Sequence, residues 1–126
     1  MSHSFTYKVL NRLFNFLGNL SLKNRLRVGA FLNFIAPLVM KRRIAIVKKN
    51  FELSFPEATQ AQRTEWQKQH TRALCQSIVD RGFIWYGDEE KIKQQVSLKN
   101  FHHLQEAMDN KEPIILLAPH FVGLDV

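Results

Sequence analysis

A histidine followed five residues later by an aspartate is the pattern in this sequence best suited to chemistry. The pair is His120 and Asp125, and none of the other four histidines has an acidic residue at that spacing. Such an aspartate can accept a hydrogen bond from the imidazole Nδ1–H, which leaves Nε2 to take a proton from a hydroxyl. Since no serine or cysteine lies close in sequence, the histidine would activate the substrate's own hydroxyl, without a covalent enzyme intermediate.

The spacing alone is weak evidence, because about one histidine in eight has an acidic residue at this distance by chance. Its context strengthens it. Pro113 opens the apolar run Ile114–Ala118, which predicts a buried parallel strand. The histidine follows that strand at the edge where open α/β sheets bind ligands, and Gly123 allows close approach of a substrate. The alternative interpretation is a histidine at a strand end with a capping aspartate.

The elements that must position this motif are predicted from the spacing of apolar residues and from the residues that begin or end helices. Thr59 and Gln62 form a capping box that opens a long helix to about Tyr86, where Gly87 and Asp88 break it. After a short helix, residues 95–99 are predicted as a strand, and Asn100 caps a helix before the strand at 114–118. The predicted fold class is therefore α/β, with about two parallel strands that begin a sheet.

Basic residues are concentrated at the front of the chain. Residues 1–50 contain ten and no acidic residue, whereas 51–126 contain 8 basic and 11 acidic residues. This charge suggests a polyanionic partner, and no zinc spacing or helix-turn-helix pattern supports nucleic acid. The ten are Lys8, Arg12, Lys23, Arg25, Arg27, Lys41, Arg42, Arg43, Lys48 and Lys49.

Two apolar stretches accompany this charge. Residues 7–20 have the spacing of an amphipathic helix, and residues 26–40 are more apolar but still contain Arg27 and Asn33. Fifteen helical residues span about 22 Å, which is short of the roughly 30 Å hydrocarbon core. We therefore predict membrane-associated helices in residues 1–40 that lie in the interface or re-enter it, ahead of a second unit in 41–126. The alternative is a soluble helical pair with a basic face.

The other candidate residues have simpler explanations. His102 and His103 fit the exposed side of a short helix, and His70 fits the packed face of the long one. Cys75 fits a buried small residue, and a single cysteine excludes an internal disulfide. Residues 88–90 form an acidic cluster that suits the start of a helix.

Two blocks of this chain resemble a known family. KRRIAIVKKNFELSFPEA, residues 41–58, is similar to the block preceding the acyltransferase domain of the bacterial lipid A late acyltransferases, of the lauroyl and myristoyl type. The match runs through Arg42, Arg43, Asn50, Phe55 and Pro56. EAMDNKEPIILLAPHFVGLDV, residues 106–126, follows in the family's order and ends in its H-x4-D/E motif.

The resemblance implies a function. Such enzymes pass a fatty acyl group from acyl carrier protein to a hydroxyl of a lipid A precursor, at the cytoplasmic face of the inner membrane. His120 matches the general base and Asp125 its orienting partner, whereas Arg42, Arg43 and Asn50 receive no role. No metal or cofactor is expected, because the thioester is already activated. The expected partners are the carrier protein, the glycolipid acceptor and an anionic membrane surface.

The sequence stops one residue after Asp125. We therefore expect an N-terminal fragment of such an acyltransferase, inactive alone. Two alternatives remain open at this point. One is an acyltransferase for another glycolipid or an aminolipid, and the other is a non-catalytic basic module that binds membrane surfaces.

Overall fold

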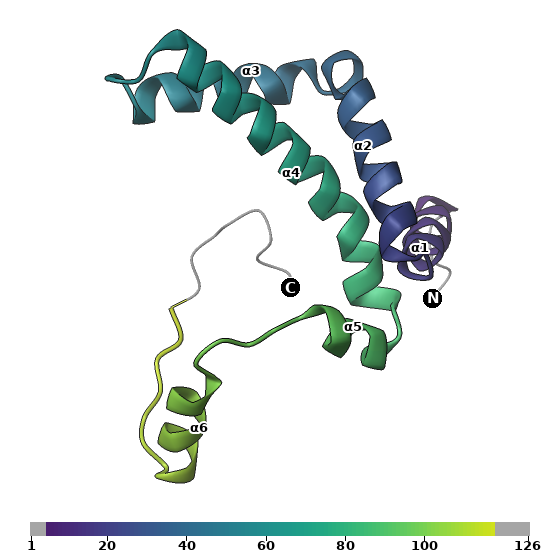
Figure 1. Ribbon diagram of the computed structural model, residues 1–126. Helices are drawn as coiled ribbons and strands as arrows, with labels where there is room; N and C mark the ends of the chain where they lie inside the picture. The colour runs from purple at the N-terminus through teal and green to yellow at the C-terminus, as the bar shows by residue number, and fades with distance from the viewer. Residues whose placement is uncertain (1–4, 118–126) are drawn as a thin grey trace.

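The long helix α4, Gln60–Tyr86, is the element on which the preceding helices assemble (Figure 1). The computed structural model describes residues 5–117. Helices α1 (Phe5–Gly18), α2 (Leu22–Val39) and α3 (Lys41–Ser54) each contact α4, and α2 also contacts α3. The chain then continues through α5 (Glu89–Gln95) to α6 (Phe101–Asp109), which extends away from this assembly.

The boundaries of α4 follow from the residues that cap it. The Thr59 hydroxyl accepts from the Gln62 amide at 3.3 Å, and the Thr59 amide donates to Gln62 Oε1 at 2.8 Å. At the other end, the Gly87 amide donates to the Phe83 carbonyl at 2.8 Å, and Asp88 caps α5. The predicted capping box and the break after Tyr86 are confirmed, because these are local interactions.

Helices α1 and α4 cross at two glycines, Gly18 and Gly82. A Cβ atom added to Gly82 would lie 2.7 Å from Leu17 Cβ and 2.8 Å from the Phe14 carbonyl oxygen. The backbones therefore approach more closely than side chains would permit. The Tyr86 hydroxyl also donates to Asn11 Oδ1 across this crossing. Buried side chains line the interior beside it, namely Leu17, Cys75, Val79 and Phe83.

Helix α3 packs on the first half of α4 through aromatic rings. Phe51 lies 6.2 Å from Trp66 between ring centroids, and Phe55 lies 5.2 Å from Trp66 in a T-shaped arrangement. Arg63 Nη1 donates to the carbonyls of Phe55 and Pro56, at 3.0 and 3.3 Å. These contacts hold the turn between α3, which ends at Ser54, and α4.

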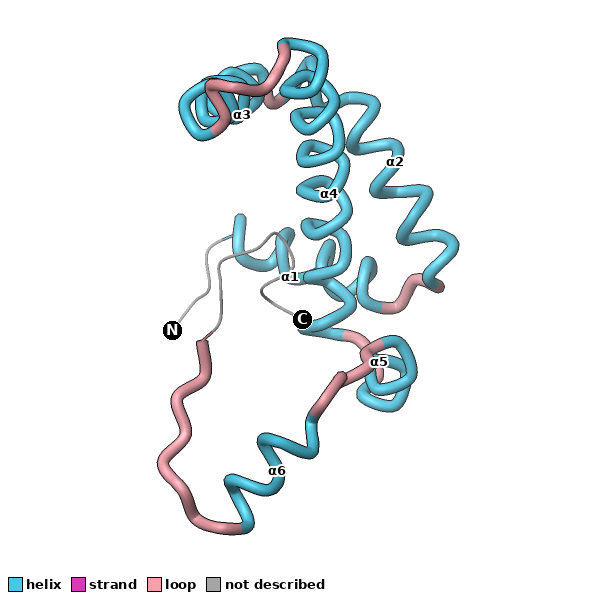
Figure 2. Tube along the Cα trace, turned by 60° about the vertical axis from the view of Figure 1, so that its left-hand side comes forward, coloured by secondary structure: helices cyan, strands magenta, loops and turns pink. Residues whose placement is uncertain are grey.

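The predicted α/β sheet is wrong for the part of the chain that the structure describes. Residues 5–117 contain no strand: Gln95 ends α5, and the segments on either side of α6 are loops (Figure 2). Ile115 and Leu117 are 95% and 93% exposed. A strand forms when its backbone amides and carbonyls pair with a neighbour. Neither predicted strand, 95–99 or 114–118, pairs with another strand within residues 5–117. Ala118 lies outside the described residues.

The fold class also placed membrane-associated helices in residues 1–40, and that assignment is wrong for the described residues 5–40, where no membrane-spanning helix is seen. Instead α1 and α2 pack against α4 and contribute Leu17 and Ala36 to its core. Within residues 5–117, no helix combines the length and apolar character needed to cross a bilayer. Polar residues explain this for α2, because its 18 residues include Lys23, Arg25 and Arg27.

Alanine substitutions at Gly82 and at Gly29 should have different effects on stability. At Gly82 the new methyl group meets the backbone of α1, so Gly82→Ala should destabilise the protein by about 1–3 kcal/mol through overpacking. At Gly29 in α2 the methyl group would meet the end of the flexible Gln76 side chain, which can rotate away at the cost of its hydrogen bond to Asp80. Gly29→Ala should then be nearly neutral, because a gain of up to about 1 kcal/mol in helix propensity offsets the loss of that hydrogen bond.

Urea unfolding followed by circular dichroism at 222 nm measures both effects. Gly29→Ala is the matched control, because it makes the same chemical change within a helix. A Gly82→Ala variant as stable as the parent protein would contradict the close crossing of α1 and α4.

Candidate functional site

The predicted base and its partner, His120 and Asp125, lie outside the described residues, as does Gly123. Their proposed interaction therefore stays a prediction. The structure does place the upstream residues that carried the resemblance. Arg42, Arg43 and Asn50 are exposed on α3. Asn50 lines a pocket of about 130 Å³ together with Phe51, Phe55 and His70.

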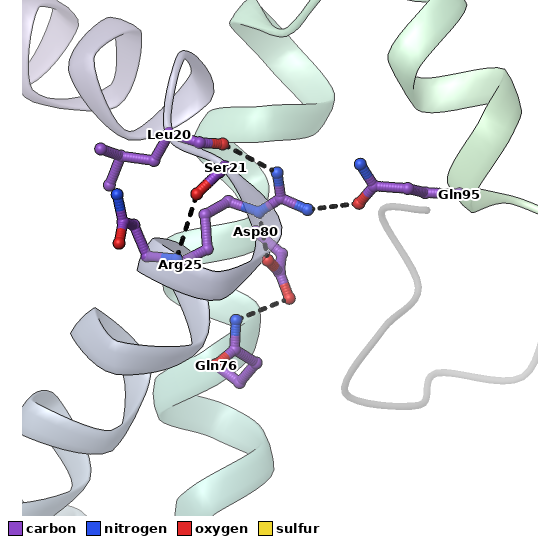
Figure 3. A network of polar contacts seen from close by, with 7 residues as sticks. Leu20, Ser21, Arg25, Gln76, Asp80 and Gln95 are labelled. Carbon is purple, nitrogen blue, oxygen red and sulfur yellow. Dashed lines mark hydrogen bonds and ion pairs between the residues drawn. The ribbon is translucent and has the colours of Figure 1, made fainter.

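The most extensively bonded polar group among the described residues is the Arg25 guanidinium on α2 (Figure 3). Arg25 is only 2% exposed. Its Nε lies 3.1 Å from Asp80 Oδ1 on α4, and its Nη2 donates to Gln95 Oε1 on α5 at 2.6 Å. Its Nη1 donates to the Leu20 carbonyl at 3.2 Å.

Arg25 is also held from the side. Its Cζ lies 3.7 Å from the centroid of the Phe83 ring, at a distance typical of a cation–π contact. The second oxygen of Asp80 accepts from Gln76 Nε2 at 3.0 Å. A buried cation is costly unless it is paired and hydrogen-bonded, and here each side of the guanidinium is satisfied. The network therefore joins α2, α4 and α5, and its geometry is that of a structural clasp.

Sequence reasoning counted Arg25 among the ten basic residues that suggest a polyanionic partner, and it missed this clasp. Its partners are 55 and 70 residues away in sequence. The sequence around Arg25 gives no local signal of its burial, because Lys23, Asn24 and Arg27 make it polar and basic. Nothing near Arg25 in the sequence identifies Asp80 as its partner.

The other candidate histidines and the cysteine lie in the environments predicted from the sequence for residues without a catalytic role. His70 packs edge-on against Phe51, with ring centroids 6.1 Å apart, whereas His102 and His103 are exposed on α6. Cys75 is buried, and burial raises the pKa of its thiol, which disfavours the reactive thiolate. Between residues 5 and 117, no three metal-ligating side chains of the His, Cys, Asp and Glu types cluster.

Comparison with known proteins identifies the family to which this chain belongs. A family model described as "Bacterial lipid A biosynthesis acyltransferase" matches residues 5–126. The chain belongs to this family, which confirms the resemblance carried by the two sequence blocks.

Curated relatives agree with this assignment. The chain is 27% identical over 100 residues to the "Lipid A biosynthesis lauroyltransferase" of Escherichia coli (strain K12), covering 79% of this chain and 33% of that protein. It is 30% identical over 88 residues to the "Lipid A biosynthesis acyltransferase" of Haemophilus influenzae, covering 70% and 28%. The chain thus spans about a third of the length of these relatives. No solved structure matches it.

The clasp predicts an asymmetric effect of removing charge. Asp80→Asn keeps an oxygen acceptor beside Arg25 but removes the anion, so the buried guanidinium would keep an uncompensated charge. We expect a loss of about 3 kcal/mol in the free energy of unfolding. Glu89→Gln is the control, because Glu89 also loses an ion pair, to Lys93, but both of those side chains are exposed. It should change stability little.

Chemical denaturation at neutral pH measures the two variants side by side. The double variant Arg25→Met with Asp80→Asn should recover part of the lost stability, since it also removes the unpaired cation. Equal, small effects of Asp80→Asn and Glu89→Gln would contradict a structural role for the Arg25 clasp.

Proposed function

We propose that this chain belongs to an enzyme that transfers a fatty acyl group from acyl carrier protein to a hydroxyl of a lipid A precursor. The observation that carries the proposal is the family match over residues 5–126, which includes the H-x4-D motif at 120–125. Relatives named for lauroyl and palmitoleoyl transfer in lipid A biosynthesis support the fatty acyl group and the acceptor class.

The proposed chemistry needs one base and its partner. His120 Nε2 accepts the proton of the acceptor hydroxyl while the hydroxyl oxygen attacks the thioester carbonyl carbon. Asp125 accepts from Nδ1–H and stabilises the imidazolium that forms. The C–S bond then breaks, and the imidazolium returns its proton to the thiolate that leaves. The proposal requires no metal or cofactor, because a thioester is already an activated acyl donor.

His120→Ala should lower kcat by about 10²–10⁴-fold, the usual contribution of a positioned general base. Asp125→Asn preserves the size of the side chain but removes its charge, so kcat should fall steeply as well. The measurement is acyl transfer by the full-length enzyme with an acyl-carrier-protein donor. His102→Ala is the matched control, because His102 is exposed on α6, and it should leave kcat unchanged.

Normal turnover of His120→Ala would contradict the assignment of the base. Loss of both turnover and carrier-protein binding would instead identify His120 as a packing residue. We expect a polypeptide of these 126 residues alone to transfer no acyl group, because the chain spans only about a third of its relatives.

We also propose that the enzyme acts at the cytoplasmic face of the inner membrane. Apolar side chains are exposed on α1 and α2 on the sides that do not face α4, and Phe34 and Leu38 are 79% and 72% exposed. Apart from the buried Arg25, the basic residues of the first 50 positions are exposed, and no acidic residue lies among those positions. An apolar surface bordered by cations suits the interface of an anionic bilayer.

Flotation with liposomes tests this location. The chain should float with vesicles containing anionic phospholipid and much less with purely zwitterionic vesicles, and added salt should weaken the binding. Phe34→Ser with Leu38→Ser should reduce flotation, whereas Val96→Ser with Leu98→Ser, a matched exposed pair after α5, should not. Absence of flotation with any vesicle would contradict the proposed location.

A further inference from the structure

Helices α2, α3 and α4 meet at the end of the assembly remote from α5 (Figure 1). Residues of these three helices line a pocket of about 330 Å³. Pro37 of α2 and Ile44 of α3 form its apolar wall. Its polar wall combines one residue of α2 with three of α4, namely Asn33, Gln67, Lys68 and Thr71. A mainly apolar cavity with a few converging polar groups is typical of a binding site for a small amphiphilic molecule.

Three polar side chains of this pocket are uncommitted. Asn33, Gln67 and Lys68 have no side-chain hydrogen bond or ion pair to any residue in the described range 5–117. Only the Thr71 hydroxyl is engaged, since it donates to the Gln67 carbonyl at 2.8 Å. The pocket therefore offers two amide groups and one ammonium group to a ligand.

The surroundings of the pocket are positively charged. Lys41 and Lys48 lie three and four residues from Ile44, so they share its face of α3. Within the described residues neither pairs with a carboxylate, whereas Lys49 pairs with Glu52 at 3.6 Å. Glu65, three residues before Lys68 on α4, accepts a hydrogen bond from Gln69 and forms no ion pair with Lys68. Among the described residues, Lys41, Lys48, Lys49 and Lys68 thus outnumber the two carboxylates near them on these helices, Glu52 and Glu65.

Helix stability does not explain this charge. Lys41, Arg42 and Arg43 occupy the first turn of α3, where the helix dipole disfavours cations, and no acidic residue accompanies them there. The pocket beside Arg25 provides a contrast. It also measures about 330 Å³, but there two carboxylates, Asp80 and Asp88, balance two cations, Arg25 and Lys91. The excess of cations over carboxylates favours an external anion at the first pocket.

We propose that the pocket between α2, α3 and α4 binds an anionic amphiphile, a phosphate headgroup attached to an alkyl chain. The phosphate interacts with Lys68 and the amides of Asn33 and Gln67, with Lys41 and Lys48 nearby. The alkyl chain lies along Pro37 and Ile44. This site does not depend on the proposed acyl transfer, because none of its residues belongs to the H-x4-D motif.

Isothermal titration of the protein with monomeric dihexanoyl phosphatidylglycerol tests the proposal. We expect saturable binding at one site, with hydrogen-exchange protection in peptides covering residues 33–44 and 64–72. Dihexanoyl phosphatidylcholine, with the same chains but no net charge, should bind at least tenfold more weakly. Inorganic phosphate should also bind at least tenfold more weakly, because it makes no contact with Pro37 and Ile44.

A single charge substitution locates the site. Lys68→Gln should weaken binding of the phosphatidylglycerol about fivefold, the usual effect of one lysine near an anionic lipid. Lys99→Gln makes the same change at an exposed residue after α5, and it should leave the affinity unchanged.

Three results would overturn the proposal. Equal affinity for the zwitterionic lipid would exclude a role for the cations, and equal affinity for inorganic phosphate would exclude the apolar wall. Equal weakening by Lys68→Gln and Lys99→Gln would show attraction by net charge alone, without a site in this pocket.

Discussion

The arrangement of the described helices depends on keeping one cation out of water. Arg25 is almost fully buried. Burial of its charged guanidinium is stable only because Asp80, Gln95 and the Leu20 carbonyl surround it. Those groups belong to three different parts of the chain. Satisfying the arginine therefore specifies where α2 lies on α4 and where α5 leaves it. Apolar burial drives the packing of these helices, but it is not directional, whereas the guanidinium accepts few geometries.

Helix α4 carries this arrangement because each part of its surface meets a different partner. Trp66 and His70 contact α3, Gln76 and Asp80 face α2, and Gly82 allows the backbone of α1 to approach closely. The outer faces of α1 and α2 retain exposed apolar side chains, and α3 retains cations without anionic partners. These outward surfaces are the parts of the described chain that its own residues leave without apolar contacts or counterions. They motivate both the proposed location at a membrane and the proposed site for an anionic amphiphile.

Family membership and helix boundaries could be read from the sequence. The blocks at 41–58 and 106–126 resembled the lipid A acyltransferases, and the family match confirms that resemblance. The capping box at Thr59 and the break at Gly87 were predicted correctly, because each depends on groups within four residues of one another. The strands at 95–99 and 114–118 were predicted from the sequence as well, and no strand forms within residues 5–117.

The sequence by itself determined those properties that neighbouring residues decide: helix ends, amphipathic faces, the imbalance of charge and the motif of His120 and Asp125. Only the tertiary structure decided what required distant partners. A strand needs another strand, so residues 114–117 remain a loop among the described residues. A buried arginine needs an anion, and Asp80 is 55 residues from Arg25 along the chain. The sequence pattern around Arg25 is the same whether its side chain meets water or Asp80, so only the packing of α2 on α4 could distinguish them.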